Sequence, residues 1–168
     1  RLNGTYAMSD KRWGIVPEGW DGSKPYYGVD GSWTYAASYQ ANDINYVLEQ
    51  CASYDIEKQF AYDRHISEYS KEVFEKLIAY LTNQGIEVEL FLCPLAPSLW
   101  DRLEAEKSHY AILDEITDFA KEMSNKYDLK ITGTYNPYEL GIKDENFYDS
   151  RHVRRELMGE FFDFYSKE

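Results

Sequence analysis

The second half of the chain alternates between amphipathic helix patterns and short apolar runs, and this alternation limits the folds open to it. Residues 66–85 place apolar side chains at helical spacing, and Gly85 stands where the helix should end. The run 86–94, IEVELFLCP, predicts a strand whose apolar residues stand together, as in buried parallel strands. Further patterns predict helices at 97–106, 110–127 and 153–167 and a short strand at 129–133.

Helix, strand, helix, strand, helix in this order is typical of parallel βαβ units. We therefore predict an α/β fold for one domain, 1–168, built as a three-layer αβα, flavodoxin-like parallel sheet. Residues 1–40 are rich in Gly, Trp, Tyr and Pro, which predicts a loop-rich segment with short extended pieces at WGIV and SWTYA. Residues 41–168 are expected to carry the βα units, with a short helix within 41–55.

The charge balance excludes several classes of partner. The 168 residues carry 18 Lys and Arg against 30 Asp and Glu, a net charge of −12. Nucleic acid and anionic lipid surfaces both require a basic surface, so neither is an expected partner. The sequence shows no apolar stretch long enough to span a bilayer and no signal peptide at its start. Two cysteines do not assign a redox compartment.

Polar side chains follow the predicted strands. Ser98 stands in LCPLAPS after the first strand, and Asn136 stands in GTYNP after the second. Because right-handed crossovers bring the carboxyl ends of parallel strands to one edge, we expect these loops to meet and bind a ligand there. Asn136 precedes Pro137, which is also an ordinary turn signal.

The loop before the last helix carries the strongest candidates for chemistry. Asp149 and His152 are three residues apart, so the carboxylate can hold the imidazole in one tautomer for work as a general base. Tyr148 precedes them and is a candidate for substrate contact. The alternative is that Asp149, with Ser150 as a second candidate, only caps the last helix. No metal ligand cluster is visible.

A second histidine has a similar setting. His65 follows Asp63 by two residues at the entry of the helix over 66–85. It is a candidate for polar contact with a substrate, because the loop before a helix lies at the same sheet edge. The alternative is a surface histidine beside a helix cap formed by Asp63.

The sequence FYDSRHVRREL resembles the last block of SGNH (GDSL-type) hydrolases, and residues 60–165 are similar to the second half of cell-envelope relatives of that family in bacteria. The resemblance implies a Ser-His-Asp triad in which His152 is the general base and Asp149 its orienting partner. It also implies an esterase or O-acyltransferase that acts on an acylated carbohydrate or cell-envelope polymer, works without a cofactor, and lies in the cell envelope or outside the cell.

The chain departs from that family at the nucleophile. It contains no Gly-Asp-Ser block, and Ser23 and Ser32 stand in Asp-Gly-Ser, which is the wrong order. One explanation is that the first strand and the serine precede Arg1 in a longer protein. The other is an inactive domain that binds a polysaccharide or protein partner. Four tryptophans could stack on sugar rings or form a small aromatic core: Trp13, Trp20, Trp33 and Trp100.

Overall fold

The computed structural model describes residues 18–27, 33–61, 65–105 and 111–161. A short N-terminal part holds β1 (Tyr26–Tyr27), β2 (Trp33–Thr34), α1 (Ala37–Gln40), α2 (Ile44–Ser53) and a π-helical turn, η1 (Glu57–Ala61). The larger part holds α3 (Glu68–Asn83), β3 (Glu89–Leu92), α4 (Pro97–Ala105), α5 (Ile112–Tyr127), β4 (Lys130–Gly133), the 3₁₀ turns η2 (Pro137–Leu140) and η3 (Asp144–Asn146), and α6 (Arg155–Phe161).

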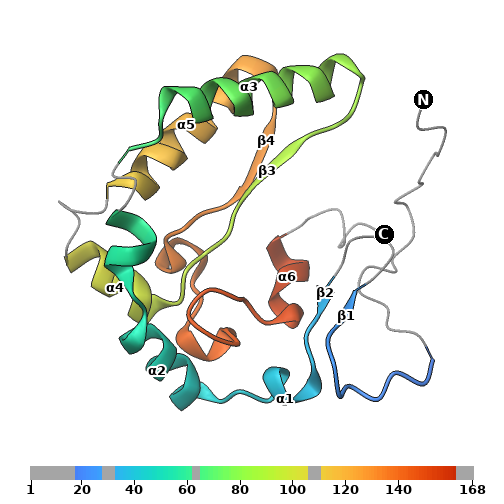
Figure 1. The fold of residues 1–168 in the computed structure, drawn as a ribbon, viewed down its shortest axis with the longest axis vertical. Coiled ribbons are helices and arrows are strands. Elements are labelled where there is room, and N and C mark those ends of the chain that lie inside the picture. The colour runs from blue at the N-terminus through green and yellow to red at the C-terminus, as the bar shows by residue number, and fades with distance from the viewer. Residues whose placement is uncertain (1–17, 28–32, 62–64, 106–110, 162–168) are drawn as a thin grey trace.

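The predicted three-layer αβα, flavodoxin-like sheet is wrong. The described residues form two sheets of two strands each, β1–β2 antiparallel and β3–β4 parallel. The βαβ pattern is confirmed only for the single unit β3–α4–α5–β4, in which Leu92 lies opposite Gly133. The segment before α3 forms helical turns and adds no strand to this pair, so the sheet is too narrow for a three-layer fold. Figure 1 shows α3 and α5 lying together at one end of the β3–β4 pair.

The helix over 66–85 is confirmed, although its packing differs from the predicted apolar stripe. The Ser67 hydroxyl caps α3 by accepting a hydrogen bond from the Ser70 amide at 3.1 Å. Gly85 ends the helix with a φ of 73°, as the sequence predicted. Ile78 is buried, whereas Val73 and Leu77 are exposed. Helix α3 contacts α5 but carries little else on its other sides (Figure 1).

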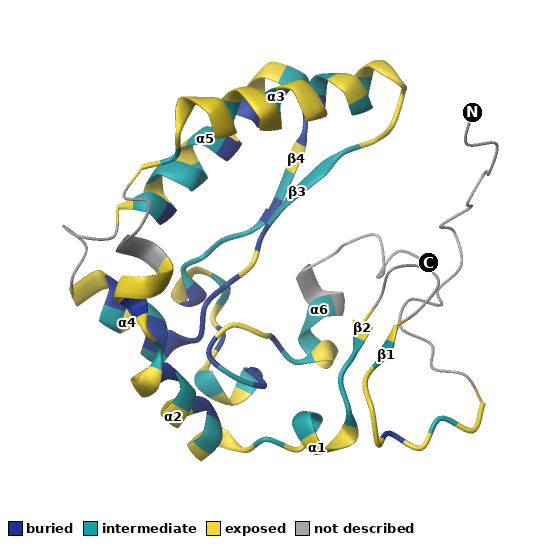
Figure 2. Cartoon of the chain, in the orientation of Figure 1, coloured by how far each residue is buried: buried dark blue, intermediate teal, exposed yellow. Residues whose placement is uncertain are grey.

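The hydrophobic core does not lie under the β3–β4 pair. It gathers around α2, α4 and the chain that follows β4, where Figure 2 shows most of the buried residues. The cluster comprises Val47, Cys51, Ile56, Leu95, Ala96, Leu99, Leu103, Leu113, Ile142, Phe147 and Val153. Phe147 and Val153 flank the Asp149–His152 segment, so the core holds both ends of the loop that carries the candidate site.

None of the helices in the described ranges combines the length and the apolar character that a membrane span requires.

Candidate functional site

The loop from Phe147 to Val153 is closed at its base. Phe147 and Val153 form an antiparallel bridge, and the Tyr148 amide donates to the His152 carbonyl at 2.8 Å. The Ser150 carbonyl accepts a hydrogen bond from the Ala96 amide at 3.1 Å, which ties the loop to the chain after β3. Because both ends are buried in the core, the loop presents Asp149 and His152 from a fixed base.

Asp149 and His152 make the contact that the sequence predicted. The Asp149 Oδ2 atom lies 2.7 Å from His152 Nδ1. The Asp149 Oδ1 atom accepts hydrogen bonds from the Arg151 and His152 amides at 2.7 and 2.9 Å. Helix α6 begins only at Arg155, so Asp149 caps its own loop and not the last helix.

A third side chain completes the environment of this carboxylate. The Tyr39 hydroxyl, which α1 positions, donates a hydrogen bond to Asp149 Oδ2. Burial alone would raise the pKa of Asp149, but the hydrogen bonds from His152, Tyr39 and two backbone amides outweigh it and hold this pKa well below its usual range. Burial, together with the bond to Asp149, raises the pKa of Tyr39, so the phenol stays protonated. Asp149 is therefore an ionised acceptor.

This arrangement fixes how His152 can act. An ionised carboxylate only accepts hydrogen bonds, so His152 Nδ1 is the donor in this contact, and in the neutral imidazole the lone pair lies on Nε2. The His152 side chain is 44% exposed and that of Asp149 is 14% exposed. The Tyr35 ring lies 5.5 Å from the imidazole at an angle of 63°. His152 can thus take a proton from a molecule in the adjoining solvent space while Asp149 stays covered.

Aromatic rings lead from His152 toward the surface. We call Tyr27, Trp33, Tyr35 and Tyr39 the aromatic row, because neighbouring rings in it lie 5.1, 5.2 and 4.6 Å apart. Tyr27 and Trp33 face each other across β1 and β2 and are 66% and 53% exposed. The row therefore joins an exposed aromatic surface to the wall of the Asp149–His152 site.

Arg154 makes hydrogen bonds that connect the end of α1 to the Asp149–His152 loop. Its guanidinium donates to the carbonyls of Glu145, Gln40 and Asn42 at 2.9, 3.0 and 2.5 Å. The same group lies over the Tyr148 ring, 4.9 Å from its centre. These contacts keep α1, and with it Tyr39, beside the loop.

Two predicted substrate-binding residues have structural partners. The Ser98 amide and hydroxyl donate to the carboxylate of Asp144 at 2.9 and 2.7 Å, at the start of α4. Asn136 caps η2 by accepting from the Tyr138 amide at 3.0 Å. Both polar groups therefore hold loops in place.

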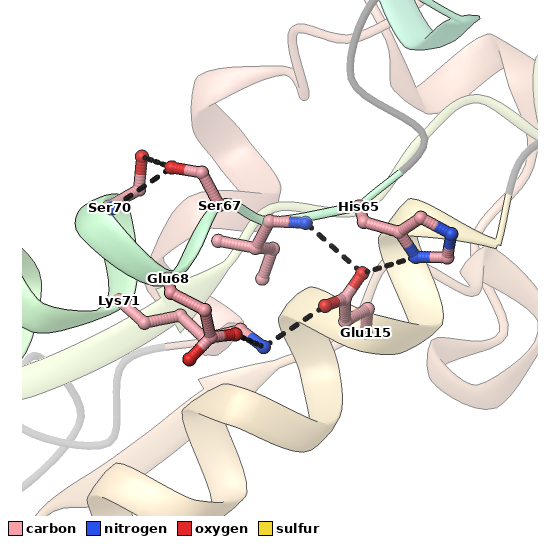
Figure 3. Close-up of polar contacts among 7 residues, drawn as sticks. His65, Ser67, Glu68, Ser70, Lys71 and Glu115 are labelled. Atoms are coloured by element: carbon pink, nitrogen blue, oxygen red, sulfur yellow. Dashed lines mark hydrogen bonds and ion pairs between the residues drawn. The ribbon is translucent and has the colours of Figure 1, made fainter.

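The two other predicted contact residues also have partners within the structure. Tyr148 is 5% exposed, and its ring packs against those of Tyr35 and Tyr39 at 5.8 and 6.1 Å. His65 lies at the start of α3, where its Nδ1 is 3.3 Å from Glu115 Oε2 (Figure 3). Its neighbours are thus α3 and α5, while the Asp149–His152 pair lies beside α1.

Among the residues that the structure describes, no serine is hydrogen-bonded to His152 in the way that the triad chemistry requires. Ser23 is exposed in a turn in which its amide donates to Asp21 at 2.8 Å, and Ser32 and Trp13 lie outside the described residues. Cys93 follows β3, and its sulfur lies 3.8 Å from the Arg151 carbonyl oxygen. Desolvation and the charge of Asp149 raise the pKa of this thiol, which disfavours the reactive thiolate.

Sequence reasoning missed Tyr39, Tyr35 and Arg154. Tyr35 and Tyr39 are spaced by four residues, a helical spacing, but nothing local connects them to a loop more than a hundred residues further on. Within the described ranges, no group of three or more His, Cys, Asp or Glu side chains is placed to hold a metal ion.

Comparison with known proteins gives no further assignment: no family model, curated protein or solved structure matches this chain.

Proposed function

We propose that this chain provides the general base of a serine esterase or O-acyltransferase of SGNH type, acting on an acylated carbohydrate or cell-envelope polymer. The observation that carries the proposal is the 2.7 Å contact between His152 Nδ1 and an ionised Asp149, which also accepts hydrogen bonds from Tyr39 and two backbone amides. The nucleophilic serine comes from outside residues 1–168. A substrate of this kind places the protein in the cell envelope or outside the cell.

In the first half of the reaction, the serine oxygen attacks the ester carbonyl while His152 Nε2 takes the serine proton. Asp149 stays ionised and stabilises the imidazolium that forms. The tetrahedral intermediate then expels the alcohol, which receives the proton from His152, and the acyl group remains on the serine.

In the second half, water or an acceptor hydroxyl attacks the acyl-serine, and His152 accepts its proton. Collapse of the second intermediate returns that proton to the serine oxygen and releases the acid or the new ester. Water as the acceptor makes the protein an esterase, and a carbohydrate hydroxyl makes it an acyltransferase.

The test is hydrolysis of p-nitrophenyl acetate, together with labelling by a fluorophosphonate, in the full-length protein that contains this chain. His152→Ala is expected to lower kcat by about 100-fold or more, because general acid–base catalysis contributes on the order of 10²–10⁴. Lys143→Ala is the matched control, since this exposed residue lies on the same connection before α6. Activity that persists in His152→Ala removes His152 from the mechanism.

A second function, binding without cleavage, is favoured by the exposed pair Tyr27 and Trp33. Flat exposed rings can pack against the C–H face of a sugar or against a protein partner. Affinity electrophoresis in O-acetylated xylan separates the two functions. Retardation that Asp149→Asn and His152→Ala leave unchanged, with no hydrolysis by any variant, supports a binding domain in place of the enzyme.

A further inference from the structure

A cavity of about 530 Å³ lies between α3, β3 and α5, and neither Asp149 nor His152 is among its lining residues. Its walls are largely apolar and include Phe74, Phe91, Ile116 and Phe119. Phe74 and Phe119 contact each other, with ring centres 5.8 Å apart, and close one side. The volume is within the range of small-molecule sites, about 300–1,000 Å³.

The residues that line this cavity are more exposed to solvent than is usual for a parallel strand pair packed beside helices. Strands of a parallel pair beside helices are usually buried, yet Glu89, Leu90 and Phe91 of β3 are only partly buried. Phe74 is exposed although it lines the cavity. Apolar surface of this kind is stabilised when an apolar group displaces the water that covers it.

The charged groups next to Ile66 and Ser67 of the lining are already paired with one another (Figure 3). Glu115 on α5 accepts from the Ile66 amide at 3.1 Å and pairs with Lys71 at 3.2 Å. Lys71 also pairs with Glu68 at 3.1 Å. This cation, held by two carboxylates, offers no counter-charge to an acidic head group. The carboxylate in the lining, Glu89, is paired with Lys130 at 3.1 Å, so the cavity favours an uncharged ligand.

The lining of the cavity extends to the end of β3, which lies next to the Asp149–His152 loop. Its lining includes Ile66 just before α3, Ile112 at the start of α5, and Leu92 at the end of β3. The next residue, Cys93, contacts the carbonyl of Arg151, the neighbour of His152. The end of the cavity lined by Leu92 is therefore close to the loop that carries the base.

We propose that this cavity binds the uncharged, apolar acyl chain of the ester substrate, an inference that rests on the proposed function for its link to catalysis. Acyl groups longer than acetyl would lie between α3 and α5, with the ester at the strand edge. The substrate class is therefore a medium-chain acyl ester and not only an acetate.

Binding is tested first with N-phenyl-1-naphthylamine, a neutral apolar dye whose fluorescence rises on burial. Ile116→Trp fills the cavity from α5 and is expected to weaken dye binding at least tenfold. Asp118→Trp places the same side chain on the exposed face of the same helix and should leave binding unchanged. Ser70→Phe adds a large side chain to the lining from α3, at an exposed position, and gives a second variant if Ile116→Trp fails to fold.

Turnover of p-nitrophenyl acetate and octanoate by the full-length protein gives the second readout. Ile116→Trp and Ser70→Phe are expected to lower kcat/KM for the octanoate at least tenfold relative to the acetate. Absence of turnover for both esters would count against the proposed function, while dye binding still tests the cavity. The acyl-chain inference is overturned if the dye does not bind the full-length protein, or if neither variant changes dye binding or chain-length preference.

Discussion

At the scale of single residues, the carboxylate of Asp149 is the group that most of the site's hydrogen bonds share. It accepts hydrogen bonds from an imidazole, a phenol and two amides, and these hold its pKa below the usual range. A carboxyl whose pKa is lower in the folded than in the unfolded state stabilises the fold above its unfolded pKa of about 3.9. That contribution is lost as the pH falls through the folded value.

Asp149→Asn is therefore expected to lower the free energy of unfolding at pH 7, and the difference from the wild type should shrink steadily below about pH 4. Urea unfolding followed by circular dichroism between pH 3 and 7 measures this. Asp118→Asn, which removes an exposed carboxylate, is the control and should give a small difference at every pH. A gap that stays constant across this range contradicts the account of Asp149.

Tyr39 supports the same carboxylate through a single hydroxyl. Tyr39→Phe keeps the ring and removes the donor, so Asp149 keeps its charge with one partner fewer. Loss of a hydrogen bond to a charged group should lower the free energy of unfolding by about 1.5–3 kcal/mol at pH 7. Tyr138→Phe is a matched control, because Tyr138 donates to Asp101 at 2.8 Å on the exposed surface. Its expected cost is below about 1 kcal/mol, and equal costs for both variants would refute the positioning role.

The site could be predicted from the sequence only where its members are close along the chain. Asp149 and His152 lie in one loop, so their spacing alone suggested the contact. Tyr39 and Arg154 act through tertiary contacts with segments more than a hundred residues away, which no periodicity reveals. Asn136 and Ser98 were placed near strand ends correctly, but their polar atoms cap local structure.

At the scale of elements, the β3–β4 pair depends on a close approach at its end. Gly133 has a φ of 76°, and a Cβ there would lie 2.5 Å from the Leu92 carbonyl oxygen. That distance is far below ordinary contact, so any side chain at 133 must push the two strands apart. The strand ends next to the Asp149–His152 loop would move with them.

Gly133→Ala should therefore destabilise the protein more than the left-handed conformation alone accounts for. Gly141→Ala is the matched comparison, since Gly141 has a φ of 66° and open space where its Cβ would be. Gly141→Ala is expected to cost about 1–2 kcal/mol, and Gly133→Ala clearly more, as measured by urea unfolding. Similar costs for the two variants would show that the contact with Leu92 relaxes easily.

Most helices were predictable from the sequence, whereas the sheet was not. Helical periodicity and Gly85 placed α3, and the pattern over 110–127 placed α5, which buries Leu113, Ala120 and Met123. The number of strands in a sheet is set by tertiary pairing. Two strand patterns joined by helices are compatible with both a wide sheet and the single β3–β4 pair that forms.

At the scale of the whole molecule, the core and the parallel pair are unevenly packed. Buried side chains gather around α2, α4 and Phe147, whereas α3 buries Ile78 alone among its sixteen residues (Figure 2). Local opening is easier where fewer apolar contacts are lost. The molecule should open first at α3 and last around the loop that holds Asp149.

Hydrogen exchange measured by mass spectrometry tests this order. Amides of α3 are expected to exchange at least about tenfold faster than those of α4, because an opening difference of about 1.4 kcal/mol corresponds to tenfold. A neutral apolar dye should slow exchange in α3 if it fills the neighbouring cavity. Equal protection of α3 and α4 without the dye would contradict the uneven packing.

Arg154 connects the segment around α1 to the loop before α6, and the kind of acceptor that it uses determines which substitutions this contact can tolerate. Its three acceptors at Gln40, Asn42 and Glu145 are main-chain oxygens, which every amino acid supplies. Substitution at those three positions can therefore leave the junction intact. The contact therefore tolerates substitution at its three acceptor positions but depends on the side chain at position 154. Lysine could not replace Arg154, because it has one nitrogen in place of the planar guanidinium group.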